Sequence, residues 1–139
     1  MSIRTVTRPR PASNGVKIRK ATPKDFSGIR KLIREHPEQL IQNHLPKTDE
    51  FFVAIVGEKM VGCCALEIYS KRLAEVRSLA VTKQFQRQGV ATELIKTCLK
   101  VARKKKVYEV LSISGSTKLF KKHGFGTFNK EKYALINIL

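Results

Sequence analysis

The sequence of 139 residues contains no tryptophan, and aromatic residues make up only 7% of it. A protein that stacks the bases of single-stranded nucleic acid needs a series of exposed rings, and the sequence has no such series. No apolar run reaches the roughly 18 residues that a membrane-spanning helix requires, so we expect neither a transmembrane segment nor a membrane partner. The first residues have no apolar core behind their basic side chains, which argues against a secretory signal.

Cysteine is also scarce. The chain has 3 cysteines, Cys63, Cys64 and Cys98. Their spacing from one another and from histidine does not match a zinc site, so we expect no metal. Cys63 and Cys64 are adjacent in an expected strand and should point to opposite faces of a sheet. We interpret the cysteines as reduced thiols in or near the core, which favours a cytoplasmic location; a reactive cysteine is the alternative.

Acidic residues are few. The chain has 11 Asp and Glu against 28 Lys and Arg, which gives a formal net charge of +17 and a pI of about 10.2. Such a basic protein attracts polyanions and acidic small molecules. Nucleic acid, ribosomes, an acidic substrate and a general compositional bias all remain consistent with this charge. We therefore keep nucleic acid or another polyanion as a candidate partner.

The length and a hydrophobic content of 42% suit one globular domain with a single core. Residues 1–15 contain arginine, proline and small residues but no acidic residue. We expect this segment to be a flexible basic arm, with a short organelle-targeting segment as the alternative. The domain itself is then expected over residues 16–139.

The spacing of apolar residues predicts a mixed α+β domain. Thr22 is a suitable helix N-cap with Pro23 at the first helical position. The turn Gly57-Glu58-Lys59 separates two apolar runs, as in a hairpin. Strands are expected at 16–20, 50–56, 60–69, 73–81 and, buried by composition, 108–113. Helices are expected from residue 22, at 90–104 and at 116–123, with a weaker piece at 38–43 and closing strands within 125–139.

The segment from Glu75 to Leu94 carries most of the functional information. An apolar strand ends at Val81, and after a short polar loop Gln86-Arg87-Gln88-Gly89-Val90-Ala91 opens an amphipathic helix. The first N–H groups of a helix lack intrahelical partners, and the helix dipole places partial positive charge there. Gly89 and Ala91 let phosphate oxygens approach the backbone closely. The segment therefore predicts a site for a diphosphate.

This strand, loop and helix resemble the acyl-coenzyme A site of the GNAT acetyltransferase superfamily. The family pattern Gln/Arg-x-x-Gly-x-Gly/Ala is matched by Gln86, Gly89 and Ala91. A second family signature is matched by Leu119-Phe120-Lys121-Lys122-His123-Gly124-Phe125. The resemblance implies a GNAT fold, in which helices flank a central, mostly antiparallel twisted sheet in a single domain. It also implies acetyl-CoA as the cosubstrate, without a metal.

The resemblance assigns cofactor contacts to particular positions. The strand residues Leu79, Ala80 and Val81 would lie along the pantetheine arm, and the Val81 N–H would polarise the thioester carbonyl. The helix start would bind the diphosphate and its surroundings through Gln86, Arg87, Gln88, Gly89, Val90, Ala91 and Thr92. The alternative for Gln86 and Arg87 is that they are solvated loop residues.

Phe120 is expected at the cofactor as well, and here the chain departs from the family. Many members have a tyrosine at this place, which protonates the leaving thiolate. Tyr108 and Tyr133 are candidate substitutes. A thiol with a pKa of ~8.5 leaves as the thiolate without much help, so activity survives the loss of this acid in principle.

Acetyl transfer to an amine needs a group that accepts a proton, because making a lysine-like amine neutral at pH 7 costs roughly 4 kcal/mol. The run from Ala74 to Val81 resembles the strand of histone-type lysine acetyltransferases in which a glutamate, at the place of Glu75, is the base. We predict this role for Glu75, directly or through water. An ion pair of Glu75 with Arg77 or Arg72 is the alternative.

The same strand resembles the acetyltransferase domain of N-acetylglutamate synthases. Arg77 would then bind a substrate carboxylate through a bidentate pair, and the acceptor would be an acidic amino acid such as glutamate. Lysine side chains or N-termini of proteins or peptides are the alternative acceptors. A non-catalytic nucleic-acid-binding module on a GNAT fold is the alternative from another class. Both a monomer and a homodimer are consistent with the sequence.

Overall fold

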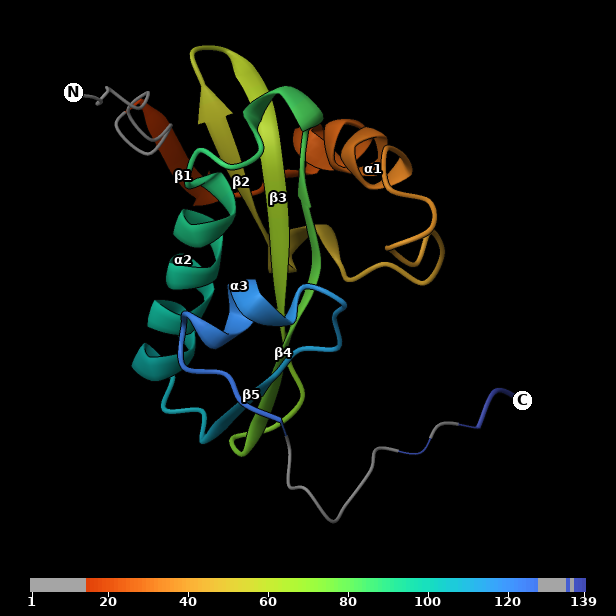
Figure 1. The fold of residues 1–139 in the computed structure, drawn as a ribbon, viewed down its shortest axis with the longest axis vertical. Coiled ribbons are helices and arrows are strands. Elements are labelled where there is room, and N and C mark those ends of the chain that lie inside the picture. The colour runs from red at the N-terminus through yellow and green to blue at the C-terminus, as the bar shows by residue number, and fades with distance from the viewer. Residues whose placement is uncertain (1–14, 128–134, 136) are drawn as a thin grey trace, which may run out of the picture.

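The computed structural model describes residues 15–127, 135 and 137–139. Its centre is a five-stranded sheet in the order β1-β2-β3-β4-β5, in which the first four strands are antiparallel and β5 runs parallel to β4 (Figure 1). The strands are β1 Val16–Lys20, β2 Phe51–Val56, β3 Lys59–Ile68, β4 Leu73–Val81 and β5 Glu109–Leu111. The helices are α1 Phe26–Arg34, α2 Val90–Lys104 and α3 Thr117–Lys121.

Helices cover both faces of the sheet, α2 to the left and α1 to the right in Figure 1. The α2 side chains Leu94, Ile95 and Cys98 are buried in a core with β-strand residues that include Cys64. Helix α1 contributes to a second core, which contains Cys63. The expectation that the adjacent cysteines point to opposite faces is confirmed, and all 3 cysteines are free and buried. Burial raises the pKa of the Cys63 thiol to about 12.

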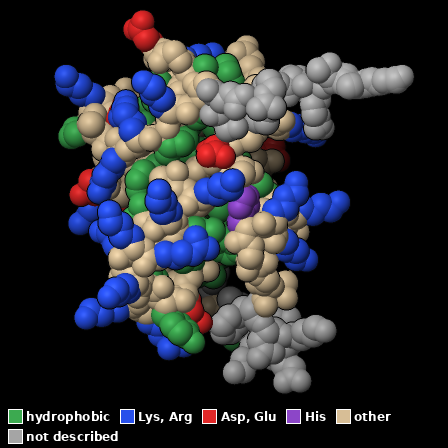
Figure 2. All heavy atoms as spheres, turned by 90° about the vertical axis from the view of Figure 1, so that its left-hand side faces the viewer, with side chains coloured by type: hydrophobic (Ala, Val, Ile, Leu, Met, Phe, Trp, Pro, Cys, Tyr) green, Lys and Arg blue, Asp and Glu red, His purple; other side chains and the backbone are tan. Residues whose placement is uncertain are grey.

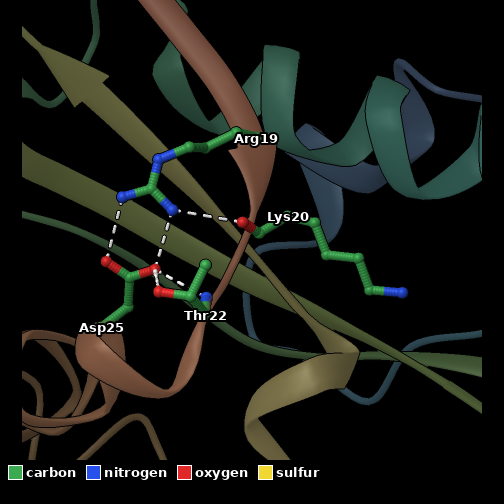
Figure 3. A network of polar contacts seen from close by, with 4 residues as sticks. All are labelled: Arg19, Lys20, Thr22 and Asp25. Carbon is green, nitrogen blue, oxygen red and sulfur yellow. Dashed lines mark hydrogen bonds and ion pairs between the residues drawn. The ribbon is translucent and has the colours of Figure 1, made fainter.

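A carboxylate holds the start of the first helical segment. Asp25 accepts hydrogen bonds from the Thr22 N–H at 2.7 Å and from Arg19 Nη1 and Nη2 at 2.7 and 3.0 Å (Figure 3). The hydrogen bond from Arg19 is the main cause that lowers the pKa of Asp25 to about 2. Thr22 is the N-cap, as predicted, but the first turn, Pro23–Asp25, is a 3₁₀ turn that leads into α1.

Two sequence-based expectations about elements are wrong. Residues 38–43 form turns and bends instead of a weak helix, and the Gln42 side-chain amide donates to the carbonyl of Ile33 at the end of α1. Strand β5 is shorter than the predicted 108–113, and Tyr108 and Ile113 are 76% and 68% exposed instead of buried. The expected arm and most of the expected closing strands lie outside the described residues.

A bulge separates the two halves of β4. Cys63 lies opposite Ala80 and Ala65 opposite Arg77, so Cys64 of β3 faces two residues of β4. One of the two, Ser78, has a φ of 56°, which is uncommon for a residue other than glycine. Strand β5 pairs with β4 only as far as Glu75. The bend and the end of this pairing leave the last residues of β4 open on the side that faces away from β3.

No helix among the described residues combines the length and the apolar character that crossing a membrane requires.

Candidate functional site

A cleft of about 950 Å³ lies at the open end of β4. Its wall combines the end of β4, the following loop, the first turn of α2, the end of the α1 region and the segment that contains α3. The lining residues are His36, Gln39, Leu79, Ala80, Val81, Gln86, Arg87, Gly89, Ala91, Thr92, Gly115, Ser116, Thr117, Lys118, Leu119 and Lys122. This set contains Lys and Arg but no Asp or Glu, so it suits an anionic ligand.

The backbone of Val81 points toward this cleft. Val81 lies opposite Gly62, and the next residue donates its N–H to the Val61 carbonyl at 2.9 Å. In an antiparallel ladder the polar groups of successive residues point alternately to opposite sides, so those of Val81 point away from β3. Two lining side chains contact its carbonyl oxygen, Gln86 Nε2 at 3.0 Å and His36 Nε2 at 3.2 Å. These contacts hold the end of β4 in place.

The loop before α2 exposes backbone amides to the same cleft. Arg87 and Gly89 have φ values of 63° and 89°, and α2 begins at Val90. The Glu93 N–H makes the first helical bond, to the carbonyl of Gly89 at 3.0 Å. Within the described part of the chain, no side chain caps this end of α2. The N–H groups of the first turn are therefore free to bind an anion, which is the geometry that phosphate groups use.

Most of the expected cofactor residues come together in the cleft. Leu79, Ala80, Val81, Gln86, Arg87, Gly89, Ala91 and Thr92 all line it. Gln88, Val90 and Phe120 do not: the Gln88 amide bonds the Gln84 carbonyl at 3.1 Å, and Val90 is buried in the core. Phe120 is also buried, edge-on to Phe125, and it lines a second cavity of about 430 Å³.

The second cavity adjoins the cleft. Both share Gln39, Leu79, Gly115 and Ser116, and the second cavity adds Ser78 and Ser112 from beside the gap between β4 and β5. Sequence reasoning missed His36, Gln39, Lys118 and Lys122 as cleft residues. His36 lies 45 residues before Val81, and no local pattern indicates their contact. Lys122 lies in the second family signature, which gives no role to it, and Lys118 directly precedes that signature.

The predicted base has a different setting. Glu75 does not line the cleft; its Oε1 accepts a hydrogen bond from the Tyr69 hydroxyl at 2.5 Å. Burial, and then the hydrogen bond and charge of Glu75, raise the pKa of Tyr69 well above its usual range. This pair lies on the α1 face of the sheet, opposite the side on which the neighbouring Ala74 and Val76 are buried.

Arg77 is engaged by groups of the protein. Its Nη1 lies 2.6 Å from Glu67 Oε1, and its Nη2 donates to the His44 carbonyl at 3.2 Å. Burial lowers the pKa of Arg77, but its hydrogen bond to Glu67 and the nearby carboxylates raise the pKa overall. Arg72 pairs with Glu109 at 3.2 Å. Among the described residues, Glu75 thus forms no ion pair with Arg77 or Arg72, in contrast to the alternative interpretation.

One candidate proton donor for the thiolate, Tyr108, is not at the cleft. The guanidinium carbon of Arg72 lies 5.2 Å from the centre of the Tyr108 ring, and Tyr108 lines a different cavity. Tyr133 lies outside the described residues. In the part of the chain that the structure describes, no group of three or more His, Cys, Asp or Glu is arranged to hold a metal ion.

Comparisons with known sequences point to one family. The Acetyltransferase (GNAT) family matches residues 17–125. An uncharacterized N-acetyltransferase of Chlorobaculum tepidum is 32% identical over 93 residues, which cover 67% of this chain and 60% of the relative. The amino-acid acetyltransferase of Mycobacterium tuberculosis is 29% identical over 117 residues, covering 78% of this chain and 67% of the relative. The chain thus spans about three fifths to two thirds of these relatives' length.

Solved structures agree with this assignment. A Mycobacterium tuberculosis protein in complex with CoA matches with a TM-score of 0.76 and 27% identity, over 81% of this chain and 73% of that one. The N-acetylglutamate synthase of Neisseria gonorrhoeae, complexed with coenzyme A and N-acetyl-glutamate, matches with a TM-score of 0.73 and 26% identity, over 85% of this chain and 30% of that one. The match of residues 17–125, together with the fold, means that the chain belongs to the GNAT acetyltransferase family.

Proposed function

We propose that this protein transfers an acetyl group from acetyl-CoA to a primary amine by direct attack. The observation that carries the proposal is the cleft, where the free amides of the first α2 turn meet cationic side chains and no carboxylate. A diphosphate fits that combination, because backbone N–H groups and the helix dipole both favour negative charge. Family membership supports acetyl-CoA as the cosubstrate.

In this proposal the cofactor follows the cleft wall. The backbone amides of residues 87–91, Gln88 among them, bind the diphosphate, with the side chains of Gln86 and Thr92 beside it. The pantetheine arm lies along Leu79, Ala80 and Val81, and the Val81 N–H stabilises the oxyanion that forms on the thioester carbonyl. Phe120 forms part of the apolar surroundings from its buried position next to the cleft.

The reaction needs one proton acceptor. The amine nitrogen attacks the carbonyl carbon, the C–S bond breaks, and the CoA thiolate leaves. We assign the acceptor role to Glu75, which takes the proton through water because it does not line the cleft. The thiolate needs no strong acid, since its thiol has a pKa near ~8.5. The proposed reaction therefore does not require a tyrosine in place of Phe120.

We infer that the acceptor is an acidic amino acid such as glutamate. The named activities of the Mycobacterium and Neisseria proteins support this inference. Arg77 would bind the substrate carboxylate, either with N–H groups that Glu67 and His44 do not use or by exchanging Glu67 for the substrate. A lysine side chain or N-terminus of a protein or peptide is the alternative acceptor.

One observation favours a second function, binding of a polyanion. Figure 2 shows the side of the molecule on which α2 lies, and Lys and Arg side chains are spread over much of it. On α2 the exposed cations are Lys96, Lys100, Arg103 and Lys104. The affinity for nucleic acid bound there would fall steeply as salt is added, because the contacts would be made to phosphates.

The test combines calorimetric titration with CoA and an assay of thiol release from acetyl-CoA. Acceptors are glutamate and aspartate, acidic and basic peptides, and polyamines. We expect CoA binding together with turnover of glutamate. Turnover of peptides alone would move the proposal to the alternative acceptor. Binding of nucleic acid with no response to CoA would contradict the enzyme and support a binding module.

A further inference from the structure

Three basic side chains line the cleft: Arg87, Lys118 and Lys122. Arg87 precedes α2, whereas the lysines come from α3 and the residue that follows it. All three are exposed. The ion pairs found among the described residues use Arg19, Arg72, Arg77 and Lys96, and none uses a cleft cation. The cleft therefore holds positive charge that no carboxylate in its own wall neutralises.

The two lysines lie on one side of α3. Lys118 and Lys122 are four residues apart, and the Lys122 N–H donates to the Lys118 carbonyl at 3.3 Å. Side chains at this spacing are neighbours on a helix surface. Lys121 is also exposed and belongs to the same helix, but it does not line the cleft. The cleft thus receives two of the three neighbouring lysines.

The chemistry of these lysines differs from that of the α2 end. Amides at the start of α2 offer fixed, directional donors, which suit the two linked phosphates of a diphosphate. A lysine is a compact point charge on a flexible stem, which suits a terminal phosphate with several free oxygens. Such a phosphate carries a charge of about −1.5 to −2 at pH 7. CoA has one group of this kind, the 3′-phosphate on its ribose.

We propose that Lys118 and Lys122 form a subsite for the 3′-phosphate of CoA. The inference rests on the proposed function, because it requires the nucleotide in this cleft. It goes further in assigning a separate phosphate to α3 and in making the protein selective for CoA over 3′-dephospho-CoA. The α2 amides serve both ligands equally, since both contain the diphosphate.

The experiment measures the dissociation constants of CoA and 3′-dephospho-CoA by calorimetry for the full chain and for Lys118→Met, Lys122→Met and the matched control Lys121→Met. We expect each cleft variant to bind CoA about fivefold more weakly, the upper range for an exposed charge pair, with the affinity for 3′-dephospho-CoA unchanged. Lys121→Met should bind both ligands as the parent protein does. The preference for CoA should also shrink as salt is added.

Several results overturn the inference. Equal affinities of the parent protein for the two ligands would remove the subsite, as would equal losses for both ligands in the lysine variants. The same loss in Lys121→Met would mean that only the general positive field matters. In all three cases CoA still binds, so the proposed function stands. Absence of CoA binding in the parent protein would overturn both.

Discussion

The two halves of β4 differ in how their polar groups are satisfied. In the first half, Glu75 is bonded to Tyr69 and Arg77 to Glu67, so the functional side chains already have partners within the protein. In the last residues, the Val81 backbone faces a cleft whose wall holds cations and no carboxylate. The last residues of β4 can therefore bind an anion without first breaking contacts within the protein. An acceptor that displaces Glu67 from Arg77 must instead break an existing contact, which weakens binding by the cost of breaking it.

The largest effect is expected from removing the charge of Glu75, which lies in the first half of β4. We expect Glu75→Gln to lower turnover about 10²- to 10⁴-fold, the usual contribution of a general base, with the affinity for acetyl-CoA unchanged. Thiol release and calorimetry measure the two effects. Glu109→Gln, on a neighbouring strand, is the control and should keep full activity. Unchanged turnover in Glu75→Gln would remove this residue from the mechanism.

The next prediction concerns the loop before α2. Gly89 has a φ of 89°, so Gly89→Ala strains the turn and moves the amides that we assign to the diphosphate. We expect the dissociation constant of CoA to rise about tenfold, as for the loss of one hydrogen bond to a charged group.

Gly57→Ala is the matched control for this loop, since Gly57 has a φ of 62° in a hairpin turn that is not part of the cleft. Both variants should melt at a lower temperature, whereas only Gly89→Ala should bind CoA more weakly. Equal CoA affinities in the two variants would contradict the assignment of the loop.

A smaller effect is expected at Arg77. Lysine cannot form the bidentate pair of arginine, so Arg77→Lys should raise the KM for an acidic amino acid by about fivefold and leave kcat nearly unchanged. Steady-state kinetics with glutamate and with a lysine peptide measure this. Arg72→Lys is the control, because Arg72 pairs with Glu109 instead. A loss that is equal for both acceptors would point to a structural role for Arg77.

The smallest effect is expected far from β4, at the start of α1. The pKa of Asp25 is lowered to about 2 in the folded protein, so its charge stabilises the fold above about pH 4, and this contribution is lost as the pH falls toward 2. Because Arg19 is half exposed, we expect Asp25→Asn to lower the free energy of unfolding by only about 1 kcal/mol at pH 7.

Urea unfolding at several pH values tests this prediction. The difference between the parent protein and Asp25→Asn should disappear near pH 2, while acetyl transfer at pH 7 stays the same. A difference that persists at low pH would mean that the hydrogen bonds of Asp25, and not its charge, stabilise the helix start.

Elements with a strong local pattern were predicted with their observed bounds. The ranges 16–20, 73–81 and 90–104 agree with β1, β4 and α2, because alternating or helically spaced apolar residues match one buried face. The ranges 38–43 and 108–113 do not agree with the observed elements. In the first, the Gln42 side-chain amide donates to the Ile33 carbonyl at the end of α1 in place of a continued helix. In the second, apolar composition alone does not reveal where β5 leaves β4.

By itself, the sequence determined the wall of the cleft from Leu79 to Thr92. A strand, a turn with glycine and a helix start are local structures, and neighbouring residues specify the amides that they expose. Only the tertiary structure decided which distant residues complete the cleft around this wall. The bulge at Ser78 and the short pairing of β5 open the cleft, and chain topology brings His36, Lys118 and Lys122 to it. Contacts between distant residues depend on packing of the whole domain, so no local pattern predicts them.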